Sequence, residues 1–241
     1  MPTIDPELEK LAAARDRFAA HGILVAISEH ALVAMASDKL ATAQFLAAAG
    51  IASPRTALPA TVLANPHAWQ WPLLAKPRHG SSGRGVRTII DPSELVGLEK
   101  DEPYIVQALL TGREFTVNMY FDEAGNIRSA VPHERLIVRG GEVEKGSTLR
   151  DAALCALARQ LASALDRPFA ALCFQAFLPD DGPPSIFEIN ARFGGGYPLA
   201  HHAGATFARW LLEQRLDRPT SANDAWRSGA VMLRYDDAVF I

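Results

Sequence analysis

Cysteine and long apolar runs are scarce in this chain of 241 residues, and each scarcity excludes a class of protein. The two cysteines, Cys155 and Cys173, lie in apolar surroundings without the spacing of metal ligands, which is typical of buried thiols in a reducing compartment. No apolar run is long enough to cross a membrane, and the acidic N-terminus lacks the basic region and apolar core of a signal peptide. We therefore expect a cytoplasmic protein that does not act in a membrane.

An excess of positive charge is also lacking. The 24 Lys and Arg residues are outnumbered by 27 Asp and Glu residues, so nucleic acid is not expected as a partner. Hydrophobic residues make up 49% of the chain, which is ordinary for a globular protein and enough for one or two domains.

Polar and apolar residues alternate along residues 186–192, directly before a run of three glycines at 194–196. In a strand, Glu188, Asn190 and Arg192 share one face, because side chains alternate between the two sides. A carboxylate and an amide oxygen suit Mg²⁺, and a neighbouring arginine can hold a phosphate. A solvated strand face would show the same alternation, but the glycines favour close approach to a ligand. The opposite face, expected to enter a core, carries Phe187, Ile189 and Ala191.

A hairpin is expected to bring a further polar residue to this face. Residues 169–177 predict a strand, and the turn at 180–182 leads back to the strand that holds Glu188. Gln175 and Glu188 then lie on adjacent strands and can face each other. Gln175 is thus a candidate metal ligand, although a surface glutamine would fit the pattern equally well.

A lysine occupies an unusual place near residue 40. Residues 37–47 predict a helix that ends at Gly50, with Lys39 in its first turn. The helix dipole is positive at that end, so a lysine there is unfavourable unless an anion also binds. An exposed surface lysine remains the alternative.

A glycine-rich loop between two expected strands has the composition of a phosphate-binding loop. It lacks the ending of a P-loop, the following helix of a dinucleotide fingerprint and the residue order of a protein kinase. A simple hairpin connection is the alternative. The candidate phosphate-binding residues are Lys76, Gly80, Ser81, Ser82, Gly83, Arg84 and Gly85.

Other patterns outline the rest of the fold. Helices are expected over residues 7–20 and after Asp91, and strands over residues 23–27, 104–110 and 111–121. Thr148 and Asp151 resemble a capping box. The helix that follows would bury a stripe of Leu154, Leu157, Leu161 and Leu165.

With these residues in hand, the chain from about Ser37 onward resembles the ATP-grasp superfamily, and within it the large chain of carbamoyl-phosphate synthetase. The resemblance implies an α+β fold in which ATP lies between a small lid and a larger antiparallel sheet. It implies a remnant of a preceding Rossmann-like domain over residues 1–36, a lid over 37–102 and a large part over 103–241. Such a remnant would leave an apolar edge at residues 23–27, so we expect self-association or a partner chain.

The resemblance also assigns roles to residues. Lys39 and Lys76 would contact the ATP phosphates, and residues 80–85 would form the mobile loop that closes over them. The adenine would contact Gln107 and Leu110, where the family more often has Glu than Gln, and the ribose would contact Glu114. Mg²⁺ (or Mn²⁺) would be bound by Gln175, Glu188 and Asn190, the phosphoryl group by Arg192, and the substrate by His133 and Arg135.

The reaction implied is ATP-dependent ligation. A small-molecule carboxylate would attack the γ-phosphate, and an amine or similar nucleophile would capture the acyl phosphate. Catalysis would rest on positioning and on charge neutralisation by Lys76, Arg192 and the metal. A nucleotide-binding module or subunit without ligase activity is the alternative, and neither substrate can be identified from the sequence.

Overall fold

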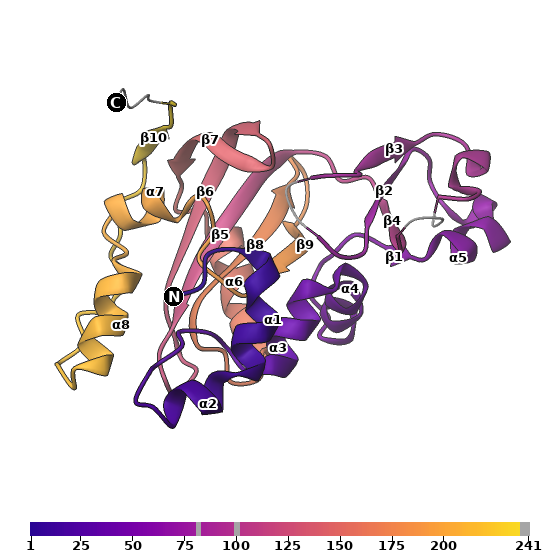
Figure 1. Cartoon of the computed structure of the whole chain (residues 1–241). Coiled ribbons are helices and arrows are strands. Elements are labelled where there is room, and N and C mark those ends of the chain that lie inside the picture. The colour runs from indigo at the N-terminus through magenta and orange to yellow at the C-terminus, as the bar shows by residue number, and fades with distance from the viewer. Residues whose placement is uncertain (81–82, 99–101, 237–241) are drawn as a thin grey trace, which may run out of the picture.

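Two antiparallel β-sheets organise the chain, and the computed structural model describes them within residues 1–80, 83–98 and 102–236. Figure 1 shows the smaller sheet standing to one side of the larger one, with the N-terminal helices packed near the join. Within the described part of the chain, no helix has the length and apolar character needed to cross a membrane.

The small sheet has four strands in the order β1-β4-β2-β3, and the helix α5 (Pro59–Ala64) packs on it. Its apolar face is closed by buried residues that include Val62, Leu73 and Val106. The strand β4 belongs to this sheet because it pairs along β2, although the boundary predicted at residues 102/103 assigns it to the large part. The strands are β1 (Thr56–Ala57), β2 (Leu73–Pro77), β3 (Arg87–Ile89) and β4 (Tyr104–Ala108).

The large sheet has six strands in the order β10-β7-β6-β5-β8-β9. All neighbouring pairs are antiparallel, as the alternation along residues 111–121 predicts. The strands are β5 (Arg113–Phe121), β6 (Ile127–Arg139), β7 (Glu142–Thr148), β8 (Ala170–Leu178), β9 (Ser185–Asn190) and β10 (Val231–Leu233).

Different helices pack on the two faces of the large sheet, and this arrangement determines where the site lies. Phe115, Val117 and Met119 of β5 pack against α6 (Ala152–Ala164) and the N-terminal helices in one apolar core. On the other face Tyr120 is covered by α7 (Tyr197–His202) and α8 (Phe207–Arg215). The far end of that second face, at the side of the small sheet, lines two cavities through residues such as Thr116 and Gln175.

Four helices precede the small sheet. The helix predicted over residues 7–20 is two helices that meet at Ala14, and Lys39 is the first residue of α4, as predicted. The strand predicted over residues 23–27 is wrong, because that segment joins no sheet and forms no regular structure. The helices are α1 (Asp5–Ala13), α2 (Arg15–Ala19), α3 (His30–Ser37) and α4 (Lys39–Ala48).

Two helix caps refine the sequence analysis. Asp151 caps α6 by accepting a hydrogen bond from the Leu154 amide, but Thr148 is not part of a capping box. Thr148 ends β7, and its hydroxyl donates to the carbonyl of Arg227. Asp91 does cap a helical turn at Pro92–Leu95, which is a short 3₁₀ helix.

A β-bulge on β9 changes the side on which one residue points. Gln175 pairs with Glu188, but the next residue of β8, Ala176, pairs with Ile186, so Phe187 is an extra residue on β9. Ile186 and Ile189 enter the core, whereas Phe187 turns to the cavity face together with Glu188. The prediction that Phe187 packs in the core is therefore wrong, because strict alternation fails at a bulge.

Candidate functional site

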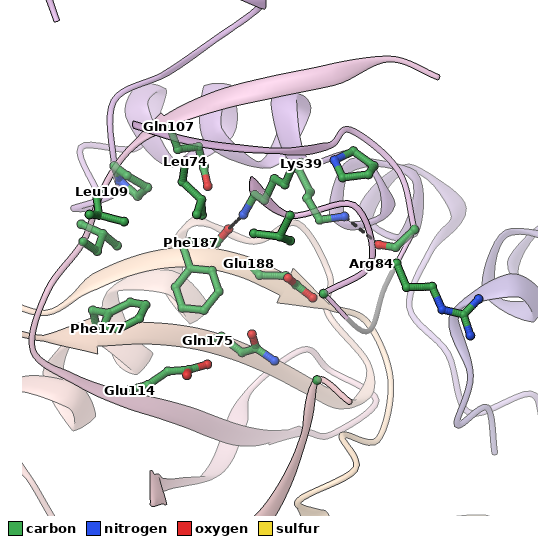
Figure 2. A pocket seen from close by; sticks show the side chains of 18 of the residues that line it. Lys39, Leu74, Arg84, Gln107, Leu109, Glu114, Gln175, Phe177, Phe187 and Glu188 are labelled. Carbon is green, nitrogen blue, oxygen red and sulfur yellow. Dashed lines mark hydrogen bonds between the residues drawn. The ribbon is translucent and has the colours of Figure 1, made fainter. Parts of the chain in front are cut away.

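A cavity of about 340 Å³ lies between the two sheets, and we call it the nucleotide cavity after the ligand that the sequence resemblance implies for it. Figure 2 shows apolar side chains on both sides of it. Leu74 lies on β2 of the small sheet, and Leu109 directly follows β4. Phe177 and Phe187 come from the large sheet, and their ring centroids are 5.3 Å apart. An apolar slot with polar groups at one end suits a planar, charged ligand.

Two lysines reach the cavity, Lys76 from β2 of the small sheet and Lys39 from the start of α4. Lys76, on β2, is 4% exposed, and its ammonium donates to the carbonyl of Phe187 at 3.3 Å. Burial lowers the pKa of Lys76 to about 8, although the charge of Glu188 acts in the opposite direction. Lys39 donates to the carbonyl of Gly80 at 2.6 Å, as drawn in Figure 2. A second lysine therefore anchors the glycine-rich loop at the cavity.

The glycine-rich loop borders the cavity through Gly80, Gly83 and Arg84. Gly80 and Gly83 have φ values of +94° and +65°, a region that side chains other than glycine rarely adopt. Arg84 is exposed at the rim, where its charge can reach an anion. Ser81 and Ser82 lie outside the described residues.

The predicted adenine and ribose residues also line the cavity, but two of them already have partners. Gln107 is 2% exposed and donates to the hydroxyl of Thr56 at 2.8 Å. Glu114 forms an ion pair with Arg135 at 2.8 Å. Burial raises the pKa of Glu114, and Arg135 opposes that shift.

The three candidate metal ligands come together at the sheet edge. Gln175 and Glu188 are register partners, and the Asn190 amide donates to the Glu188 carboxylate at 3.1 Å. No group of three His, Cys, Asp or Glu side chains that could hold a metal occurs in the described ranges. One carboxylate with two amide oxygens nevertheless suits Mg²⁺, which keeps waters and takes its other ligands from phosphates.

Arg192 does not line the nucleotide cavity. It lines an adjoining cavity of about 630 Å³, which we call the second cavity, and donates to both oxygens of Asp5 at 2.6 and 2.8 Å. Burial acts to lower the pKa of Arg192, but the hydrogen bonds to Asp5 and the charges of Cys173, Asp5 and Glu142 together outweigh it, and the pKa is raised. The sequence pattern gave no sign of this partner, which is 187 residues away.

His133 and Arg135 differ in their access to ligands. His133 is completely buried, which lowers its pKa to about 3, and it lines neither cavity. Arg135 lines both cavities and donates to Thr116 and to the carbonyl of Gly141. Of the two, Arg135 alone is placed to meet a substrate.

The fold thus gathers most of the predicted site residues around two connected cavities. Gly85, Asn190 and Arg192 line the second cavity only. Those that line the nucleotide cavity are Lys39, Lys76, Gly80, Gly83, Arg84, Gln107, Leu110, Glu114, Gln175 and Glu188.

Sequence comparison identifies the family. A profile described as "ATP-grasp in the biosynthetic pathway with Ter operon" matches residues 100–238. The chain belongs to this ATP-grasp family. The predicted superfamily and α+β fold are confirmed, whereas the closer resemblance to carbamoyl-phosphate synthetase stays a prediction. No curated protein sequence matches significantly.

Solved structures share the ATP-grasp fold. Biotin carboxylase from Campylobacter jejuni has a TM-score of 0.77 at 14% identity, over 93% of this chain and 56% of that one. Carboxyaminoimidazole ribonucleotide synthase from Aspergillus clavatus has a TM-score of 0.73 at 18% identity, over 92% and 62%. L-amino acid ligase from Bacillus licheniformis has a TM-score of 0.68 at 21% identity, over 92% and 56%. The ATP-grasp chain therefore spans about 56–62% of the length of these proteins.

Proposed function

We propose that this protein is an ADP-forming carbon–nitrogen ligase, which activates a carboxylate as an acyl phosphate with MgATP and joins it to an amine. The supporting observation is that cationic side chains and candidate metal ligands lie on opposite sides of one cavity. Lys39, Lys76 and the loop of Gly80 come from one side, and Gln175 and Glu188 from the other.

The residues that line the cavities would have different roles in phosphoryl transfer. The apolar slot would hold the base, and the two lysines would neutralise the phosphates, where a low dielectric strengthens each contact. Gln175, Glu188 and Asn190 would hold Mg²⁺, which supplies charge stabilisation at the transferred phosphoryl group. Arg135, at the junction of the cavities, would orient the carboxylate for attack.

The solved structures are consistent with nucleotide binding in this fold. The biotin carboxylase structure is described as a complex with an ATP analogue, and the carboxyaminoimidazole ribonucleotide synthase structure as a complex with ATP. The third is described as an amino acid ligase. Ligation by this chain is a proposal that the arrangement of Lys76 and Glu188 supports.

A hydroxylamine assay tests the proposal without knowledge of the nucleophile. Hydroxylamine captures acyl phosphates, so a panel of carboxylates with MgATP should give hydroxamate and equal amounts of ADP for at least one acid. Lys76→Ala should abolish both products. MgATP binding without ADP release from any acid would instead support the alternative, a nucleotide-binding module without ligase activity.

A further inference from the structure

The second cavity is nearly twice as large as the nucleotide cavity and opens from it, because Arg135, Gln175 and Glu188 line both. Gly194, Gly195 and Gly196 form its floor, and the space that a Cβ would need there is taken by the side chains of Cys173, Glu142 and His133. A second reactant placed there would lie next to the terminal phosphate of a nucleotide in the first cavity. The charges that line this cavity therefore determine which kind of nucleophile it can bind.

The charges that line the second cavity are mostly paired. Arg192 is held by both oxygens of Asp5, and Arg135 by Glu114. Glu188 accepts a hydrogen bond from Asn190 and belongs to the proposed metal site. Of the charged residues that line this cavity, Arg84, Glu102 and Glu142 have no hydrogen bond or salt bridge to a residue that the structure describes, so two free carboxylates stand against one free guanidinium.

Glu142 is the one of these three that lies against Gly195. It begins β7, and its carboxylate has no hydrogen bond or salt bridge to any residue that the structure describes. A Cβ placed on Gly195 would collide with this carboxylate, so the glycine lets Glu142 lie over the cavity floor. The charge of Glu142 also acts on Arg192, which places it at the same end of the cavity.

From this geometry we infer that the second cavity binds the nucleophile as a positively charged amine and that Glu142 binds its ammonium group. The Glu142 carboxylate then accepts one proton, so that the neutral amine attacks the acyl phosphate and inorganic phosphate leaves. The inference rests on the proposed ligase function. An ammonium offers three donors to an acceptor-only carboxylate, and such charge-assisted contacts are stronger than neutral ones. The cavity would thus select cationic amines over neutral nucleophiles of the same shape.

Calorimetry on the chain with MgADP bound tests the inference directly. The cationic probes are glycinamide, L-lysinamide and putrescine, and the neutral match is N-acetylglycinamide. We expect at least one cation to bind, no binding of the neutral probe, and an affinity loss of roughly tenfold or more in Glu142→Gln. Glu142 is exposed at a turn, so this variant should fold normally.

Two further variants show whether binding depends on the position of the Glu142 carboxylate or on negative charge near the cavity in general. Glu144→Gln, on the same strand but outside both cavities, should bind the probes like the wild type. Gly195→Ala keeps the charge but displaces the Glu142 carboxylate, so it should also weaken binding. Equal binding to the wild type and to Glu142→Gln, or no binding of any cation to the wild type, would overturn the inference.

The hydroxylamine assay distinguishes this failure from that of the ligase proposal. Hydroxylamine is uncharged at pH 7.5, so hydroxamate formation by the wild type reports on the ligase reaction alone, and Glu144→Gln should match it. Glu142→Gln should lose amide formation with cationic amines, which Glu144→Gln should retain. If the wild type forms no hydroxamate, the ligase proposal fails. If hydroxamate forms but amide yield is independent of Glu142, only the amine site fails.

Discussion

At the scale of single residues, burial brings the pKa of Lys76 close to physiological pH. The side chain lies in the wall of the small sheet, and burial lowers its pKa to about 8. Below pH 8 the free protein carries the ammonium that a phosphate needs, and above it the lysine becomes neutral. We therefore predict that MgATP affinity is greatest below pH 8 and falls by up to about tenfold per pH unit above it.

The measurement is calorimetry from pH 7 to 9.5 on the wild type, Lys76→Ala and Lys76→Arg. Lys76→Ala should lose about 1.5–3 kcal/mol of binding free energy at pH 7, because a charge-assisted contact disappears. Lys76→Arg should bind without the fall above pH 8, since arginine stays protonated. A wild-type affinity that is flat across this range would show that the lysine does not contact the nucleotide.

Glu188 provides the second prediction at this scale. Glu188→Gln keeps the shape of the side chain but removes the one carboxylate of the proposed metal set, so half-maximal ADP release should need at least about tenfold more Mg²⁺. The midpoint of thermal unfolding should change little, because the side chain is only partly buried. Identical Mg²⁺ titrations of wild type and variant would show that Glu188 is not a ligand.

At the scale of elements, the β9 bulge separates core residues from cavity residues. Phe174 on β8 is fully buried in the apolar core, whereas Phe187 borders the nucleotide cavity. Phe174→Ala should lower the free energy of unfolding by about 3–5 kcal/mol. Phe187→Ala should leave unfolding in urea nearly unchanged but cost about 1–3 kcal/mol of MgATP binding, because the base loses an aromatic surface. The reverse pattern would place Phe187 in the core after all.

The same bulge shows where sequence reasoning reaches its limit. Local periodicity predicted the hairpin that pairs Gln175 with Glu188 and a helix with Lys39 in its first turn. A one-residue insertion leaves no trace in hydrophobic alternation, so the position of Phe187 was missed. The strand expected over residues 23–27 failed because an apolar run forms a strand only when a neighbouring strand can pair with it.

At the scale of the whole molecule, the site depends on contacts between distant segments. The nucleotide cavity takes its walls from both sheets, so a nucleotide would bridge them. MgADP at 100 times its Kd should therefore raise the free energy of unfolding by about 2.7 kcal/mol. It should also slow tryptic cleavage after the exposed Arg84, because the loop would pack on the phosphates. Cleavage at an unchanged rate with MgADP bound would show that the loop does not cover the nucleotide.

The ion pair between Asp5 and Arg192 joins the first helix to the segment just after β9, the strand of Glu188 and Asn190, across 187 residues. Arg192 is 11% exposed at its side chain, so removing its partner leaves a mostly buried charge without compensation. Asp5→Asn should lower the free energy of unfolding by about 1–3 kcal/mol in urea titrations. Glu9→Gln, an exposed acid of the same helix without a described ion pair, should change it by less than about 0.5 kcal/mol.

In the double variant Asp5→Asn with Arg192→Gln, the losses should be less than additive by about 0.5–3 kcal/mol, because the two side chains stabilise each other. Strictly additive losses would mean that the first helix is held by its apolar contacts alone and that Arg192 is positioned without it.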